Sequence, residues 1–230
     1  MAGHVLSAGG TEARRGVRHR VCLAGKLLKE ASRPMTLLID CAFIEHWHPL
    51  YEKTETDQPK YEMILRDVER DLKEHGTLAK TTFLRIIDWK AARVKGALTD
   101  DYSQYERNIA VAHQTTDPIE RILTLTALDG IGVPVASTIL HFMDPDAIPI
   151  NDYRTVEVLH YAGLLLHLSR DAKRFPAFMQ TILKIRENCP SFTLRQIDRA
   201  LFAYHKQYFE PEIKSIRSSK KSCRGRVRER

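Results

Sequence analysis

Apolar residues recur at every third or fourth position along most of the chain. The clearest example is an unbroken stripe near its end, formed by Leu194, Ile197, Leu201, Tyr204 and Tyr208. This spacing gathers the apolar side chains on one face of an α-helix. No segment convincingly alternates apolar and polar residues with the two-residue period of a strand, so the sequence predicts an all-α fold.

The predicted helices are separated by residues that interrupt helices. The first helix is expected to end at Pro49, before a loop over residues 54–59, and two later helices are expected to stop at Gly76 and Gly96. In chain order, we expect helices over residues 37–50, 61–76, 79–94, 100–114, 118–128, 133–143, 153–160, 173–187 and 193–208.

The positive charge of the sequence lies in its two ends. The 230 residues have a formal net charge of +7, but residues 1–34 and 211–230 together carry +11, which leaves −4 for the residues between them. We expect the first of these basic tails to be disordered, because it lacks a steady apolar period. Dense cations attract a phosphate backbone whatever its base sequence, so the tails predict a nucleic acid as partner.

The four cysteines are scattered and predict free thiols. Cys22, Cys41, Cys189 and Cys223 show no Cys-x-x-Cys spacing, which is typical of a protein in a reducing compartment. No apolar run approaches the length of a membrane span, so we expect no membrane partner and a cytoplasmic, nucleoid-associated or nuclear location. Organellar targeting by the arginine-rich N-terminus remains an alternative, as does a native start at Met35.

The middle of the sequence combines a helix, a glycine hairpin and a second helix. Asp117, Pro118 and Glu120 are typical of a helix start, and Gly130 and Gly132 then interrupt the helical pattern. A helix N-terminus approached through glycines presents unpaired N–H groups to an anion such as phosphate. The alternative interpretation is an ordinary turn between two antiparallel helices.

A second motif follows one helix later. The hairpin reads Leu-Asp-Gly-Ile-Gly-Val-Pro-Val-Ala-Ser from Leu128, and Ile-Pro-Ile-Asn-Asp-Tyr-Arg follows from Ile148. Together, the two motifs resemble the helix-hairpin-helix DNA glycosylases of base-excision repair, over residues 126–158. The resemblance implies that the hairpin grips the DNA backbone and that Asp152 is the catalytic aspartate.

The resemblance also assigns roles within the hairpin. It implies DNA-backbone binding through the N–H groups of Gly130, Gly132, Val133 and Val135. It implies a monovalent cation held by the backbone carbonyls of Leu128 and Ile131. Two departures matter: Pro134 stands where bifunctional members carry their nucleophilic lysine, and the four closely spaced cysteines of cluster-bearing members are missing. We therefore expect hydrolysis without Schiff-base lyase activity, no iron–sulfur cluster and no other cofactor.

The expected architecture has two intimate helical subdomains with a cleft between them. Residues 35–58 and 144–210, from both chain ends, would form one subdomain. Residues 59–143 would form the other, with the hairpin at residues 128–133. Asp152 would lie at the mouth of the cleft, and the candidate pocket residues are Trp89, Phe142, Tyr153 and Arg154.

Each candidate residue also has a purely structural interpretation. A carboxylate near C1′ of the sugar would stabilise an oxocarbenium-like transition state, but Asp152 before Tyr-Arg-Thr-Val is also a common helix N-cap. Trp89 either stacks on a base or is half-buried against the protein. Tyr153 either lines the pocket or packs in the core, and Arg154 either contacts DNA or pairs with an acid such as Glu157.

The sequence supports two principal hypotheses about function. The first is a monofunctional DNA glycosylase, acting as a monomer, that flips a modified base out of the helix and cleaves its N-glycosidic bond. The second is a non-catalytic helix-hairpin-helix DNA-binding protein. It is favoured by the net negative charge of the middle region and by Pro134, which has no N–H group to offer a phosphate. A third alternative is a helical domain that binds another protein while the tails alone contact nucleic acid.

Overall fold

A computed structural model describes residues 37–55 and 57–225, with side chains as far as residue 210 except at residues 52 and 54. The described residues are all-α and contain no strand, which confirms the predicted fold class. The predicted disorder of residues 1–34 and the basic side chains of residues 211–230 lie outside this description. Within the described chain, no helix has both the length and the apolar character needed to cross a membrane.

The helices follow one another with short connections. In chain order they are α2 (Cys41–Thr54), α3 (Gln58–His75), α4 (Lys80–Ala91), the 3₁₀ helix η1 (Ala92–Ala97), α5 (Ser103–Gln114), α6 (Pro118–Thr126), α7 (Val133–Met143), α8 (Tyr153–Tyr161), α9 (Phe175–Asn188) and α10 (Leu194–Gly225).

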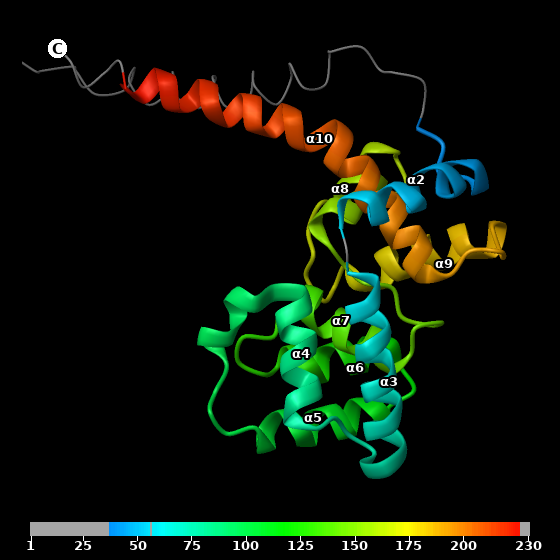
Figure 1. Cartoon of the computed structure of the whole chain (residues 1–230), viewed down its shortest axis with the longest axis vertical. Helices are drawn as coiled ribbons and strands as arrows, with labels where there is room; N and C mark the ends of the chain where they lie inside the picture. Colours follow the sequence, from blue (N-terminus) through cyan, green and yellow to red (C-terminus); the bar gives the residue numbers. More distant parts are fainter. Residues whose placement is uncertain (1–36, 56, 226–230) are drawn as a thin grey trace, which may run out of the picture. The chain divides into compact units, whose positions relative to one another are not determined.

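Five of these helices, α3 to α7, pack together around apolar side chains. α3 contacts α4 and α7, α4 contacts α7, and α6 contacts both α5 and α7 (Figure 1). The most deeply buried side chains of this group include Ile64, Phe83, Ile86, Ile109, Ile122 and Ile139. The hairpin between α6 and α7 is therefore attached to a well-packed group of helices.

A second group joins helices from both ends of the described chain. α10 packs along α2 and also contacts α8 and α9 (Figure 1). The predicted apolar stripe makes these contacts: Ile197 and Leu201 are completely buried, and the ring of Tyr204 lies 5.2 Å from that of Trp47. From residue 38 onward the described residues form one unit by their contacts, so the predicted division into two subdomains stays a prediction.

Local signals account for several helix boundaries. Gly76 ends α3 with a φ of 67°, a left-handed conformation that glycine adopts without a steric cost. Asp117 caps α6, because its side chain accepts a 2.8 Å hydrogen bond from Ile119 N. Both predictions from the sequence are confirmed.

Other predicted boundaries are wrong. Pro49 lies inside α2, which continues past it, and η1 runs through Gly96. Proline removes one helical hydrogen bond, but the buried Tyr51, whose ring lies 5.2 Å from that of Phe202, stabilises the turn that follows. Pro59, expected in a loop, occupies the first turn of α3, where its missing N–H is not needed.

The prediction of free thiols is wrong for one pair of cysteines. Cys41 and Cys189 form a disulfide, with their Cα atoms 5.4 Å apart. They are 148 positions apart in the sequence. They meet because Cys41 begins α2, Cys189 caps the C-terminus of α9, and both helices pack against α10. Cys22 and the side chain of Cys223 lie outside the described residues.

Candidate functional site

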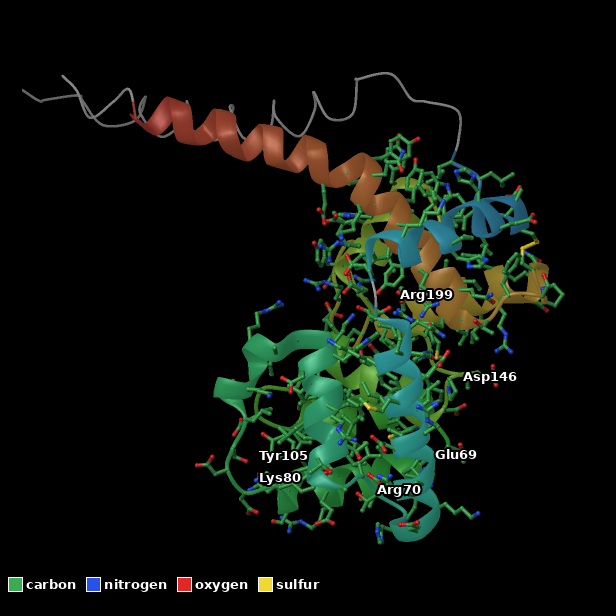
Figure 2. The ribbon with its side chains drawn as sticks, viewed as in Figure 1. Glu69, Arg70, Lys80, Tyr105, Asp146 and Arg199 are labelled. Carbon is green, nitrogen blue, oxygen red and sulfur yellow. A yellow bond between two sulfur atoms is a disulfide. The ribbon has the colours of Figure 1, made fainter. Side chains whose placement is uncertain are left out.

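A pocket of about 340 Å³ opens where the two groups of helices meet. Figure 2 shows Arg199 of α10 at this junction. The volume lies within the usual range of small-molecule sites. The pocket is lined by Tyr51, Glu55, Asp57, Lys60, Asp88, Trp89, Lys90, Ile150, Asp152, Arg154, Arg195, Asp198 and Phe202.

Asp152 lies in the wall of this pocket, and both of its side-chain oxygens accept hydrogen bonds. Oδ1 accepts a 3.0 Å bond from Arg154 N, which caps α8, and Oδ2 accepts a 2.9 Å bond from Lys90 Nζ. The exposed fraction is 12% for the Lys90 side chain and 16% for that of Asp152. Burial raises the pKa of Asp152, but the Lys90 ammonium and the two hydrogen bonds outweigh burial and hold that pKa below its usual value. Asp152 is therefore ionised at neutral pH.

Helix α7 holds the segment that carries Asp152. Ser137 Oγ accepts a 2.9 Å hydrogen bond from Asn151 N, and His141 Nδ1 donates a 2.7 Å bond to the Ile148 carbonyl. Burial lowers the pKa of His141 to about 3, so its ring is neutral. Ser137 lies about 6 Å along the helix axis from the first residue of α7. This anchor fixes the segment that carries Asp152 to the N-terminal half of α7.

The glycine hairpin presents unpaired N–H groups at the start of α7. Within the described part of the chain, no acceptor binds the N–H groups of Gly130, Gly132 or Val133. The N–H of Val135, in contrast, donates a 2.9 Å hydrogen bond to the Gly132 carbonyl inside the first helical turn. Three of the four predicted donors thus have no acceptor among the described residues, as an anion site at a helix N-terminus requires.

The two glycines of the hairpin have different structural roles. Gly130 has a φ of 75°, and a Cβ there would lie 3.0 Å from Leu98 Cδ2 and 3.1 Å from the Ala97 carbonyl oxygen. Gly132 has a φ of −86°, and a Cβ there would meet only Pro134 Cδ, at 3.8 Å. A side chain at Gly130 would therefore be strained and crowded, whereas Gly132 keeps the exposed approach to the helix N-terminus open.

The carbonyls of the hairpin are partly engaged. The Leu128 carbonyl accepts a 3.1 Å hydrogen bond from Ile131 N, and the Asp129 carbonyl accepts a 3.0 Å bond from the hydroxyl of Tyr105, which is labelled in Figure 2. A carbonyl oxygen has two lone pairs, so the Leu128 carbonyl could accept this hydrogen bond and still bind a cation. The predicted cation at Leu128 and Ile131 stays a prediction. Among the described residues, no cluster of three or more His, Cys, Asp or Glu side chains is suited to a metal.

The structure brings only some of the predicted pocket residues together. Trp89 and Arg154 line the pocket with Asp152, whereas Phe142 and Tyr153 do not. Phe142 is buried, with its ring 5.3 Å from that of Trp89. The ring of Tyr153 packs 4.5 Å from the Arg154 guanidinium.

Arg154 pairs with Glu210 and not with Glu157, the partner that the sequence suggested. Arg154 Nη2 lies 2.7 Å from Glu210 Oε1, whereas Glu157 accepts a 2.6 Å hydrogen bond from His205 Nε2. Arg154 thus links α8 to α10 in the pocket wall. The sequence could not reveal this pairing, because Glu210 lies 56 positions away.

Sequence reasoning missed a buried polar network from α10. Arg195 Nη2 donates to Asp57 Oδ2 at 2.9 Å and to the Tyr51 hydroxyl at 3.2 Å, and Arg195 Nη1 donates to Asp198 Oδ2. Arg195 and Asp198 are 7% and 6% exposed. The sequence does show Arg195 and Asp198 three positions apart beside the apolar stripe. Such a pair is common on exposed helix surfaces, so it does not by itself indicate a buried network.

Comparisons of the chain with models of known protein families, with curated proteins and with solved structures found no match. The resemblance to helix-hairpin-helix glycosylases therefore depends on the two motifs in residues 126–158. Their functional interpretation depends on the pocket and hairpin geometry described above.

Proposed function

We propose that the protein excises a modified base from DNA by hydrolysing its N-glycosidic bond, with Asp152 as the carboxylate at the sugar. The observation that supports this proposal is the position of Asp152. It lies ionised in the wall of a pocket together with the aromatic side chain of Trp89. The segment that carries it is held by α7, the helix that follows a hairpin with three N–H groups lacking an acceptor among the described residues.

The carboxylate meets the main requirement of the reaction. As the glycosidic bond breaks, positive charge develops on the sugar, and a fixed negative charge nearby stabilises that transition state. The capping bond from Arg154 N fixes the orientation of the carboxylate. The Lys90 ammonium keeps it ionised in a nearly buried site.

The hairpin supplies a place for a DNA phosphate. The N–H groups of Gly132 and Val133 lie at the N-terminus of α7, where the helix dipole also favours negative charge, and Gly130 precedes them in the hairpin. A phosphate bound there would place the adjacent sugar near Asp152, because Ser137 of the same helix holds Asn151. The flipped base would then enter the pocket beside Trp89.

The pocket favours hydrolysis over attack by an amine. Pro134 removes the lysine that bifunctional glycosylases carry at this position of the hairpin. Lys90 is the amine nearest to Asp152, but its Nζ is bound to the carboxylate at 2.9 Å as an ammonium, which has no lone pair for attack. We therefore propose water as the nucleophile, oriented by Asp152.

The test is an unbiased search for released bases. The full chain is incubated with duplex DNA carrying many lesions and modifications, and free bases are identified by mass spectrometry. The proposal predicts release of at least one modified base, leaving an intact strand with an abasic site. Binding to DNA without release of any base would contradict it.

A second candidate function is DNA binding without catalysis. It is favoured by one observation: both side-chain oxygens of Asp152 already have protein partners, Arg154 N and Lys90 Nζ. In that case Asp152 is a helix cap and half of an ion pair, and nothing more. The same incubation separates the two candidates, since this one predicts binding through the hairpin and no released base.

A further inference from the structure

The pocket contains a second carboxyl group that the proposed reaction has not used. Asp198 lies on α10, one helical turn before Phe202, and lines the pocket with Asp152. Only 6% of the residue is exposed. Its Oδ2 accepts from Arg195, but its Oδ1 is buried without a hydrogen-bond partner among the described residues. A buried carboxyl oxygen without a partner needs an explanation, and Asp57 Oδ1 in the same pocket wall is a second such atom.

The surroundings of the two carboxyl groups differ. Lys90 lies 2.9 Å from Asp152 and forms an ion pair with that carboxylate. Asp198 shares the single charge of Arg195 with Asp57. Burial raises the pKa of Asp198, and the negative charge of Asp152 adds to this rise, although Arg195 and Lys90 oppose it. The net result is a pKa above the usual value, opposite to that of Asp152.

Two carboxyl groups whose environments favour opposite protonation states are suited to separate roles in one reaction. We propose that Asp198 is the general acid that protonates the departing base, while Asp152 stabilises the sugar and accepts a proton from the attacking water. This inference depends on the proposed glycosylase function. It adds to that function a second catalytic residue and a preference for uncharged bases.

The reaction balances with water as the only co-reactant. The bond between C1′ and the base nitrogen breaks, and its electron pair leaves with the base. The proton of the Asp198 carboxyl group moves to the base, which departs neutral. Water adds its oxygen to C1′ and gives one proton to Asp152. Exchange with solvent returns a proton to Asp198 and removes one from Asp152.

The geometry allows Asp198 to present its proton. If the proton is on Oδ1, no acceptor in the described protein binds it, but this oxygen is buried and a bound base reaches it only after the carboxyl group turns. The χ2 torsion of an aspartate is broad, which lets the carboxyl group turn toward the pocket. Oδ2 already accepts from Arg195, which leaves Oδ1 as the oxygen that carries the proton.

The inference predicts that dependence on Asp198 varies with the charge of the base. An uncharged base would leave as an anion unless an acid protonates it. A base with a fixed positive charge, such as 7-methylguanine, leaves neutral without a proton. Loss of Asp198 should therefore slow release of uncharged bases and have little effect on a cationic one.

The experiment measures single-turnover release by the full chain from duplexes that carry one hypoxanthine, one uracil or one 7-methylguanine. The variants are Asp198→Asn, which keeps the size but removes the acid, and Asp57→Asn, which removes another carboxylate partner of Arg195. We expect Asp198→Asn to slow release of an uncharged base by roughly 100-fold or more and release of 7-methylguanine by less than about threefold. Asp57→Asn leaves Arg195 to Asp198 alone, so it should move the alkaline fall of the uncharged probes to lower pH without changing release of 7-methylguanine.

A pH series supplies a second readout. For an uncharged probe, the parent rate should fall as pH rises through the pKa of Asp198, and this fall should be missing from the residual rate of Asp198→Asn. Equal losses on both kinds of probe, or an unchanged alkaline fall in the variant, would overturn the role of Asp198 while leaving the proposed function intact. A parent that releases none of the three bases would overturn this inference. No release from the wider set of modified bases would overturn the proposed function as well.

Discussion

At the scale of single residues, the contact between Lys90 and Asp152 has the largest consequences. It joins α4 to the start of α8 across the pocket, and both side chains are nearly buried. Loss of one partner of a buried ion pair leaves the other charge unpaired in a poorly solvated site. The pair therefore stabilises the fold and, in the proposed mechanism, also keeps the carboxylate ionised.

We expect Lys90→Met to lower the free energy of unfolding at pH 7 by about 3 kcal/mol. The pKa of Asp152 is lower in the folded protein than in the unfolded chain, so the pair stabilises the fold above the unfolded pKa, about 4. This contribution is lost as the pH falls through the folded pKa. Urea denaturation should therefore show a smaller difference from the parent at low pH, with Lys60→Met, at an exposed lysine of the same pocket, as control. A difference that does not vary with pH would contradict this account.

The residues of the site were only partly predictable. The sequence predicts Trp89, Asp152 and Arg154 in the pocket, and they line it. Motif spacing accounts for Asp152 and Arg154, whereas Trp89 lies outside the two motifs. Asp57 and Asp198 were not expected, since they meet through Arg195 across 138 sequence positions. Their contact depends on how α10 packs against α2, which no local pattern in the sequence specifies.

At the scale of elements, the two glycines of the hairpin between α6 and α7 have different roles: Gly130 matters for stability and Gly132 for the proposed binding of DNA. Gly130 has the positive φ and the close neighbours, whereas Gly132 has an ordinary φ and open space. The sequence predicted that both glycines allow either a positive φ or a close approach. The difference between them depends on η1, whose last residue, Ala97, and the following Leu98 pack against Gly130.

The two glycines allow a matched pair of variants. We expect Gly130→Ala to lower the free energy of unfolding by about 1 to 3 kcal/mol, because of the positive φ and the contact with Ala97. Gly132→Ala should fold as the parent does, and Gly132→Val should weaken DNA binding by blocking the free N–H groups. Chemical denaturation and titration with labelled duplex measure both effects. Unchanged DNA affinity for Gly132→Val would contradict the role of the hairpin.

At the scale of the whole molecule, α10 connects distant parts of the chain. It contacts α2, α8 and α9 and supplies three residues of the pocket. The helical class and most helices were predictable from apolar periodicity, because burying one face of each helix leaves that pattern in the sequence. The disulfide between Cys41 and Cys189 was not predictable, since it depends on how α2 and α9 dock on the same helix.

We expect reduction of this disulfide to lower the free energy of unfolding by about 2 to 5 kcal/mol, because the bond closes a long loop in the unfolded chain. Denaturation with and without dithiothreitol measures the effect. The double variant Cys41→Ser and Cys189→Ser is the control, because the reductant should no longer change its stability. An equal response of parent and double variant to the reductant would show that this bond does not stabilise the protein.

The most direct test of the central claim is the single-turnover rate of base release by Asp152→Asn. Asparagine keeps the size of the side chain and its ability to cap α8 but removes the negative charge. The matched control is Asp117→Asn, which changes the cap of α6 outside the pocket. We predict a rate at least about 100-fold lower for Asp152→Asn and a rate equal to that of the parent for Asp117→Asn. Equal rates for Asp152→Asn and the parent, on a base that the parent releases, would contradict the assignment of Asp152 as the catalytic carboxylate.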